Sequence, residues 1–96
     1  KPDADIDAWA TPLHGGGWLL DGLMPVSELK ARLNIDELPL EDKSRYNTLA
    51  GLLMSVLGRL PQVGEKIECA GWIFGVEKMQ GRRIDKVRAH VATPVN

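Results

Sequence analysis

The chain has 96 residues, of which 44% are hydrophobic and 26% are charged, a composition typical of one small globular domain. Twelve basic and thirteen acidic residues give a net charge of −1. This balance argues against a nucleic-acid or membrane-surface binder, because such proteins need a basic excess. The apolar runs are shorter than the ~20 residues of a membrane span, so we expect no direct membrane insertion.

The two ends of the chain carry little that could be buried. Residues 1–8 contain three aspartates and a proline and are expected to form a linker or tail. Residues 94–96 are expected to fray. Because the chain begins with Lys1 rather than methionine, we expect it to be part of a longer protein. Its single cysteine, Cys69, cannot form an internal disulfide and fits a reducing compartment.

The first predicted elements are two short strands at residues 9–13 and 18–21. Three consecutive glycines at residues 15–17 separate them, which predicts a β-hairpin with a glycine turn. Glycines can also cradle a phosphate, but that geometry needs a helix after the loop. A strand follows here, so the turn is favoured.

A first helix is predicted over residues 25–33. Pro25 suits its first position, where a missing N–H is harmless, and Asn34 suits its end. Residues 35–45 then form a polar connection, in which Leu38 and Leu40 are expected to pin the chain to the core.

The second predicted helix, residues 48–57, is the most hydrophobic part of the chain. Leucines and valines recur at helical spacing, and Leu52 and Met54 widen the apolar stripe, which predicts cover on more than one side. Asn47 is the favoured N-cap and Ser44 the alternative. Gly58 is placed to end the helix.

One residue of this second helix, Gly51, interrupts a sequence of good helix formers. Glycine in a helix interior costs about 1 kcal/mol relative to alanine. We therefore expect close approach of another backbone to its bare Cα.

Three strands are predicted to follow, at residues 66–70, 72–79 and 82–91, with a tight turn at Gln80-Gly81. Ile84 is out of phase with Val87, and a regular strand cannot bury both on one face. A β-bulge near Asp85-Lys86 is therefore predicted. The predicted fold class is α+β: a small, mostly antiparallel sheet of four to five strands with two helices, in the order β-(β)-α-α-β-β-β.

Two sets of side chains are candidates for binding. The acidic cluster Asp36, Glu37, Glu41 and Asp42 could attract a divalent cation or a basic partner, although a solvated loop is favoured because no spacing fixes a cation cage. The arginines Arg59, Arg82 and Arg83, with Arg88, could bind a phosphate or a carboxylate if they converged. Scattered solvated arginines are the default. No cluster of titratable residues indicates catalysis.

A series of short motifs gives a more specific indication. Residues 46–51 read YNTLAG and residues 57–61 read LGRLP; Gly64-Glu65, Phe74-Gly75-Val76 and Arg82-Arg83-Ile84 follow. The series resembles the transporter-associated domain of the CorC/HlyC family, over roughly residues 18–91. We therefore expect such a domain at residues 9–93.

The resemblance implies a parent protein with an N-terminal membrane domain, then a pair of CBS domains, then this module on the cytoplasmic side. Such parents are hemolysin-related or magnesium and cobalt efflux proteins. The fold implied is similar to that of the FAD-binding/transporter-associated domain-like group. No catalytic residue is implied.

Two functions are therefore expected. The first is a non-catalytic regulatory module of a membrane ion transporter, which contacts the CBS pair and membrane domain of its own parent or a second copy in a homodimer. The alternative is a domain that binds FAD or an adenine nucleotide, suggested by fold kinship and by Arg59, Arg82 and Arg83. A stand-alone enzyme is the least favoured.

Overall fold

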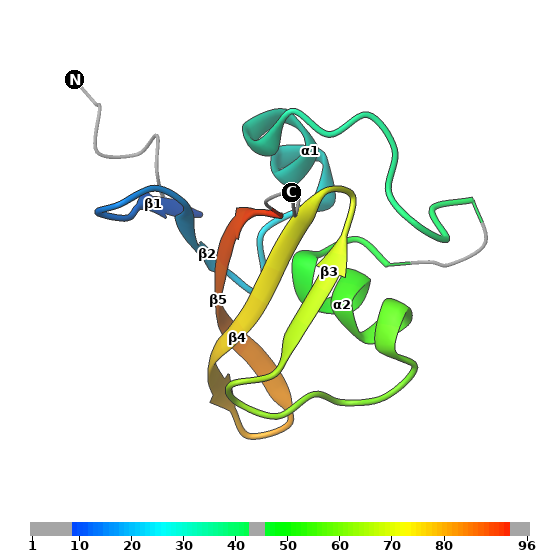
Figure 1. The fold of residues 1–96 in the computed structure, drawn as a ribbon. Helices are drawn as coiled ribbons and strands as arrows, with labels where there is room; N and C mark the ends of the chain where they lie inside the picture. The colour runs from blue at the N-terminus through cyan, green and yellow to red at the C-terminus, as the bar shows by residue number, and fades with distance from the viewer. Residues whose placement is uncertain (1–8, 43–45, 93–96) are drawn as a thin grey trace.

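The computed structural model describes residues 9–42 and 46–92; the predicted tail and frayed end lie outside them. It is an α+β fold with one five-stranded antiparallel sheet and two helices (Figure 1). The elements in chain order are β1 Ala10–Pro12, β2 Trp18–Asp21, α1 Val26–Leu33, α2 Leu49–Leu57, β3 Lys66–Cys69, β4 Trp72–Gln80 and β5 Arg83–Val91. The predicted fold class and element order are confirmed.

The sheet has the strand order β1-β2-β5-β4-β3. The N-terminal hairpin is therefore joined to the last strand of the chain, with Leu20 opposite Val87 in the β2–β5 register. Gly15, Gly16 and Gly17 all have positive φ angles and connect β1 to β2, which confirms the predicted glycine turn.

One face of the sheet carries the hydrophobic core. Side chains alternate along the strands, so that Ile67 and Cys69 of β3 are buried while Lys66 and Glu68 are exposed. The helices cover this face, and the strands and helices together form one cluster of buried residues. The other face of the sheet bears mostly polar and charged side chains.

Helix α2 supplies much of the core. Leu49, Leu52 and Leu53 are fully buried, whereas Met54 is 37% exposed. The buried part of the helix is therefore broad, as its composition predicts, but the side that carries Met54 is uncovered in this chain.

The N-cap of α2 is Thr48 and not Asn47, so that prediction is wrong. The helix begins at Leu49, and the residue directly before it has the extended backbone that a cap requires. The Thr48 hydroxyl accepts a hydrogen bond from the Gly51 N–H at 3.1 Å. The alternative cap, Ser44, lies outside the described residues.

Other backbone groups at the start of α2 are satisfied by the segment before α1. The Leu49 N–H donates to the Met24 carbonyl and the Ala50 N–H to the Gly22 carbonyl, both at 2.9 Å. Pro25 is the N-cap of α1 rather than its first helical residue, and it forms an isolated β-bridge with Thr48. The two helix starts are thus tied together.

The predicted helix ends are confirmed. Asn34 and Gly58 both adopt the left-handed conformation directly after their helices. Gly51 has a close neighbour, but it is a side chain and not the backbone that was predicted: a Cβ there would lie 3.0 Å from the Tyr46 Cβ, whereas the Tyr46 Cα, at 3.6 Å, is at an ordinary contact distance.

The predicted bulge is present in β5. Between the pairs Lys78–Lys86 and Met79–Ile84, β5 contains one extra residue, Asp85, and an irregularity in β4 next to Lys78 compensates for it. Ile84 and Val87 are consequently both fully buried. The tight turn is centred on Gly81-Arg82, one residue later than predicted, because Gln80 still pairs with Arg83.

The bulge presses against Gly22. The Gly22 N–H donates to the Asp85 carbonyl at 2.8 Å, and a Cβ on Gly22 would lie only 2.0 Å from the Ile84 carbonyl oxygen. Glycine is therefore required here by the close approach of two backbones and not by a positive φ.

Candidate functional site

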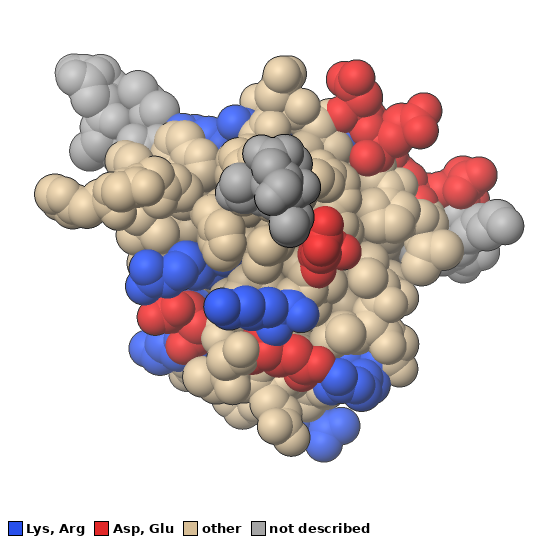
Figure 2. Space-filling model, viewed as in Figure 1, with Lys and Arg blue, Asp and Glu red and all other residues tan. Residues whose placement is uncertain are grey.

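The acidic cluster lies on the connection from α1 to α2. Glu37, Leu38, Glu41 and Asp42 line an open hollow with a volume of about 460 Å³; Asp36 is exposed nearby. Acidic side chains gather in this region of the surface, at the upper right of Figure 2. The structure therefore brings three of the four predicted acids to one hollow. We call residues 37–42 the acidic turn.

The acidic turn is fixed by three contacts. Glu41 Oε2 accepts a hydrogen bond from Lys30 Nζ at 2.6 Å, and Glu41 Oε1 accepts one from the Leu38 N–H at 2.9 Å. The Tyr46 hydroxyl donates to the Pro39 carbonyl at 2.7 Å. Leu38 is 5% exposed, which confirms that it pins this connection to the core.

Leu40 behaves differently from the prediction. It is 44% exposed, and its φ of +60° places it in the left-handed region. The expectation that Leu40 pins the loop to the core is therefore wrong. With this backbone conformation, the Leu40 side chain lies in solvent.

The electrostatics of the acidic turn follow from these contacts. The hydrogen bond from Lys30, with a second from the Leu38 backbone, lowers the pKa of Glu41 below its ordinary value. Burial, and then the nearby Glu41 charge, raise the pKa of Tyr46. Both Glu41 oxygens are thus engaged within the protein.

A metal centre is not formed by the described residues. Within residues 9–42 and 46–92, no three His, Cys, Asp or Glu side chains are grouped so as to hold a metal ion. A divalent cation at Asp36, Glu37, Glu41 and Asp42 stays a prediction.

The predicted arginine set is divided among three places, with Arg88 on β5 apart from the other three. Arg59, just after α2, forms a two-pronged ion pair with Glu65. This pair raises the pKa of Arg59 and lowers that of Glu65. Arg82 and Arg83 are exposed at the β4–β5 turn, which lies apart from the end of α2 in Figure 1. Binding of a phosphate by these three residues stays a prediction.

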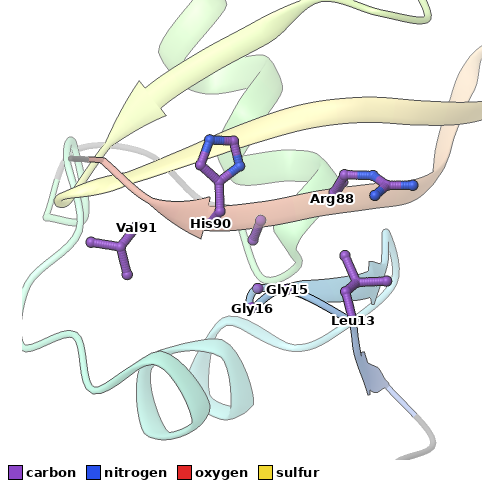
Figure 3. A pocket seen from close by; sticks show the side chains of 8 residues that line it. Leu13, Gly15, Gly16, Arg88, His90 and Val91 are labelled. Atoms are coloured by element: carbon purple, nitrogen blue, oxygen red, sulfur yellow. The ribbon is translucent and has the colours of Figure 1, made fainter.

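A second open hollow, also of about 460 Å³, lies between the β1–β2 turn and the end of β5 (Figure 3). We call it the glycine hollow. Figure 3 shows Arg88 and His90 projecting from the same side of β5 beside Gly15 and Gly16. Its lining is completed by small and apolar residues: Leu13, Gly17, Ala89 and Val91.

Arg88 is partly engaged in this hollow. Its Nε and Nη2 donate to the two carboxylate oxygens of Glu77 at 3.2 and 3.4 Å. The third guanidinium nitrogen, Nη1, stays outside this pair, so the side chain retains donors for another acceptor.

Cys69 has the properties of an inert thiol. It is 8% exposed on the inner face of β3. Burial raises its pKa to about 11, so almost no thiolate forms near neutral pH.

Several contacts at these two hollows cannot be predicted from sequence motifs. Three glycines predict a turn, but only the β2–β5 pairing brings that turn beside Arg88 and His90. Lys30 and Tyr46 show no motif that identifies them as anchors of the acidic turn.

Comparison with known proteins places this geometry in a family. Residues 11–92 match the family model CorC_HlyC, described as "Transporter associated domain". Among curated relatives, the UPF0053 protein sll0260 of Synechocystis is 40% identical over 72 residues, 75% of this chain and 16% of that protein. The polyamine export protein of Escherichia coli K12 is 33% identical over 70 residues, 73% of this chain and 15% of that protein. The chain thus spans about a sixth of the length of these relatives.

Solved structures agree in fold. The CorC_HlyC domain of a Xylella fastidiosa hemolysin, solved in complex with Mg²⁺ and Mn²⁺, has a TM-score of 0.79 and 34% identity, covering 90% of this chain and 100% of that chain. The corresponding domain of a CBS domain protein from Porphyromonas gingivalis has a TM-score of 0.75 and 26% identity, covering 88% and 98%.

In the described part of this chain, neither helix has the length and apolarity needed to cross a membrane. The matched residues include both helices and nearly the whole sheet, and the family's domains are parts of transporter-type proteins. The chain belongs to the CorC/HlyC family of transporter-associated domains.

Proposed function

We propose that this chain is a non-catalytic regulatory module on the cytoplasmic side of a membrane ion transporter. The observation that carries the proposal is the family match over residues 11–92, within relatives about six times longer that include an export protein. The rest of such a parent would supply the membrane path and a CBS pair, and this domain would modulate transport by contact with them.

The distribution of side chains supports a contact role. Some charged groups of the polar sheet face form cross-strand pairs, such as Arg88–Glu77 and Lys86–Asp21. Met54 on α2 and Leu40 in the acidic turn are left at the surface. These two side chains are available for contact with another protein surface.

The proposed cargo is a cation. Parents of this family are expected to move magnesium or cobalt, and one relative 33% identical to this chain is a polyamine exporter. Metal dications and polyamines are both multivalent cations, so the proposal covers this chemical class rather than one ion.

The test is deletion of residues 18–91 from the full-length parent, with membrane abundance measured in parallel. Efflux of Mg²⁺, Co²⁺ and spermidine from loaded cells should change in rate or in concentration dependence, while the amount of transporter remains the same. Glu28→Gln, an exposed change on α1 outside the candidate binding residues, is the control and should leave efflux unchanged. Unaltered efflux after the deletion would contradict the regulatory role.

The flavin alternative rests on fold kinship and on Arg59, Arg82 and Arg83, of which Arg59 is paired with Glu65. Titration of the domain with FAD decides it. A thermal shift and quenching of flavin fluorescence, both lost in an Arg82→Ala, Arg83→Ala variant, would establish binding; no change at high FAD concentration would exclude it.

A further inference from the structure

β3 is an edge strand, and its outer side has no neighbour in the sheet. The strand order places β1 and β3 at the two margins of the sheet (Figure 1). β1 has only three residues and ends at Pro12, which has no N–H to donate. β3 contains no proline. Of the two margins, β3 is therefore the better suited to accept another strand.

The hydrogen-bond pattern shows which residues of β3 direct their backbone groups outward. Bonded and non-bonded pairs alternate along antiparallel strands, and the Val76 N–H donates to the Glu65 carbonyl at 2.9 Å. Glu65 thus bonds toward β4, and Ile67, two residues further, does the same. The N–H and C=O groups of Lys66 and Glu68 consequently point away from the sheet. In the described ranges, no turn or loop backbone bonds to them.

The side chains of the same two residues carry opposite charges. Lys66 and Glu68 are exposed on the polar face of the sheet, two positions apart. Other charged side chains of this face form cross-strand pairs, such as Arg88–Glu77. Among the residues that the structure describes, none pairs with the side chain of Lys66 or Glu68. The edge therefore presents one cation and one anion beside its outward backbone groups.

An antiparallel strand of the same sequence satisfies both sets of groups in one register. When Lys66 lies opposite Glu68 of a second copy, the two residues exchange both of their backbone hydrogen bonds. The symmetry of the pair repeats this exchange, so each lysine faces a glutamate on the polar face. The neighbouring registers place Lys66 opposite Lys66 or Glu68 opposite Glu68, and like charges directly opposite are destabilising.

We propose that β3 pairs with β3 of a second copy, antiparallel and with Lys66 opposite Glu68. The contact has a two-fold axis at Ile67 and joins the two five-stranded sheets into one. A lysine at a sheet edge usually discourages pairing. Here Glu68 supplies the opposite charge, so the lysine selects one partner and one register. This pairing concerns the domain itself and does not depend on the proposed regulatory role.

The first test is sedimentation equilibrium of the 96-residue chain at low salt, from about 10 μM to about 1 mM. A solved relative that consists of this domain alone shows that the unit folds by itself. We expect a monomer–dimer equilibrium. Lys66→Glu and Glu68→Lys should each weaken it about tenfold or more, because each change creates two like-charged pairs across the axis. Glu28→Lys, the same charge change at an exposed position of α1, is the matched control and should dimerise as the unchanged chain does.

A mixing experiment tests the register. Lys66→Glu has only acidic side chains at the two edge positions, and Glu68→Lys has only basic ones. An equimolar mixture should form heterodimers at a concentration where each variant alone is monomeric, because every glutamate then faces a lysine. The double variant with Lys66→Glu and Glu68→Lys restores the opposition of charges and should dimerise as the unchanged chain does.

Amide hydrogen exchange tests whether β3 is the strand involved. The N–H groups of Lys66 and Glu68 face solvent in the monomer, so their exchange should slow as the concentration rises to about 1 mM. The Ile67 N–H already bonds toward β4 and serves as the control, since its exchange should change far less.

Four results would overturn the proposal. The unchanged chain could be monomeric at about 1 mM, or Lys66→Glu could dimerise as strongly as the unchanged chain. A mixture of the two single variants that stays monomeric would exclude the register. Dimerisation without slower exchange at Lys66 and Glu68 would place the contact on another surface.

Discussion

Replacement of Gly22 by alanine should be among the most damaging single changes in this fold. Gly22 is buried where the chain passes the bulge of β5. The new Cβ would lie 2.0 Å from the Ile84 carbonyl oxygen and 2.9 Å from its carbon. Both atoms belong to backbone, so no side-chain rotation can relieve the contact.

The expected loss of stability follows from how far the backbone at Gly22 must move away from Ile84. Restoring an ordinary contact of 3.4 Å requires a displacement of about 1.4 Å, which breaks the Gly22–Asp85 hydrogen bond of 2.8 Å and disturbs the bond from Ala50. Overpacking costs about 1–3 kcal/mol, and a buried backbone group without a partner costs about 1–3 kcal/mol. We expect a loss of about 3–5 kcal/mol in the free energy of unfolding, from a total of about 5–15 kcal/mol.

Urea unfolding followed by tryptophan fluorescence measures this loss. With a slope of about 1 kcal/mol per M, the midpoint for Gly22→Ala should fall by about 3–5 M, or the variant should be unfolded without urea. Gly75→Ala is the matched control, because its Cβ would meet nothing closer than 3.7 Å and its φ is not positive. It should stay within about 1 kcal/mol of the unchanged domain. A midpoint for Gly22→Ala equal to that of Gly75→Ala would refute the reasoning.

Three further outcomes test other features. Thr48→Ala should cost about 1 kcal/mol in urea unfolding through loss of the cap, whereas Asn47→Ala, at an exposed position, should cost clearly less; the reverse order would restore Asn47 as the cap. Cys69 should react with a thiol reagent at pH 8 about a hundredfold more slowly than an unfolded thiol, because burial raises its pKa from 9.0 to about 11; equal rates in native and urea-unfolded protein would contradict its burial. Because Lys30 lowers the pKa of Glu41 below 4.5 in the folded state, this ion pair stabilises the domain above pH 4.5 and is lost as the pH falls through the lowered value. The stability difference between the unchanged chain and Glu41→Gln should therefore shrink in acid, and a difference constant from pH 7 to pH 3 would exclude the pair as its cause.

Much of the fold is predictable because local periodicity determines it. Alternation in β3 gives its buried face, and the phase conflict between Ile84 and Val87 gives the bulge in β5. Errors of one residue occur where neighbouring residues compete for one role, as Asn47 and Thr48 do for the cap. Composition cannot separate them, because the outcome depends on which residue pairs with Pro25.

The surfaces are less predictable than the core. An acidic stretch is visible in the sequence, but no motif reveals the left-handed backbone of Leu40 or the contacts that Lys30 and Tyr46 make with the residues beside it. Similarly, Gly22 resembles a simple turn residue, and only the tertiary contact with Ile84 reveals why a side chain is excluded.

The position of β2 beside β5 imposes an order on synthesis. Asp21 and its partner Lys86 are 65 residues apart, a span that a ribosome takes about 3 to 13 seconds to make. Until then the first hairpin has no neighbour, and an isolated hairpin is at best marginally stable in water. A nascent chain therefore acquires its native sheet only when its final strand emerges, and a truncation before residue 83 would detach both ends of the domain at once.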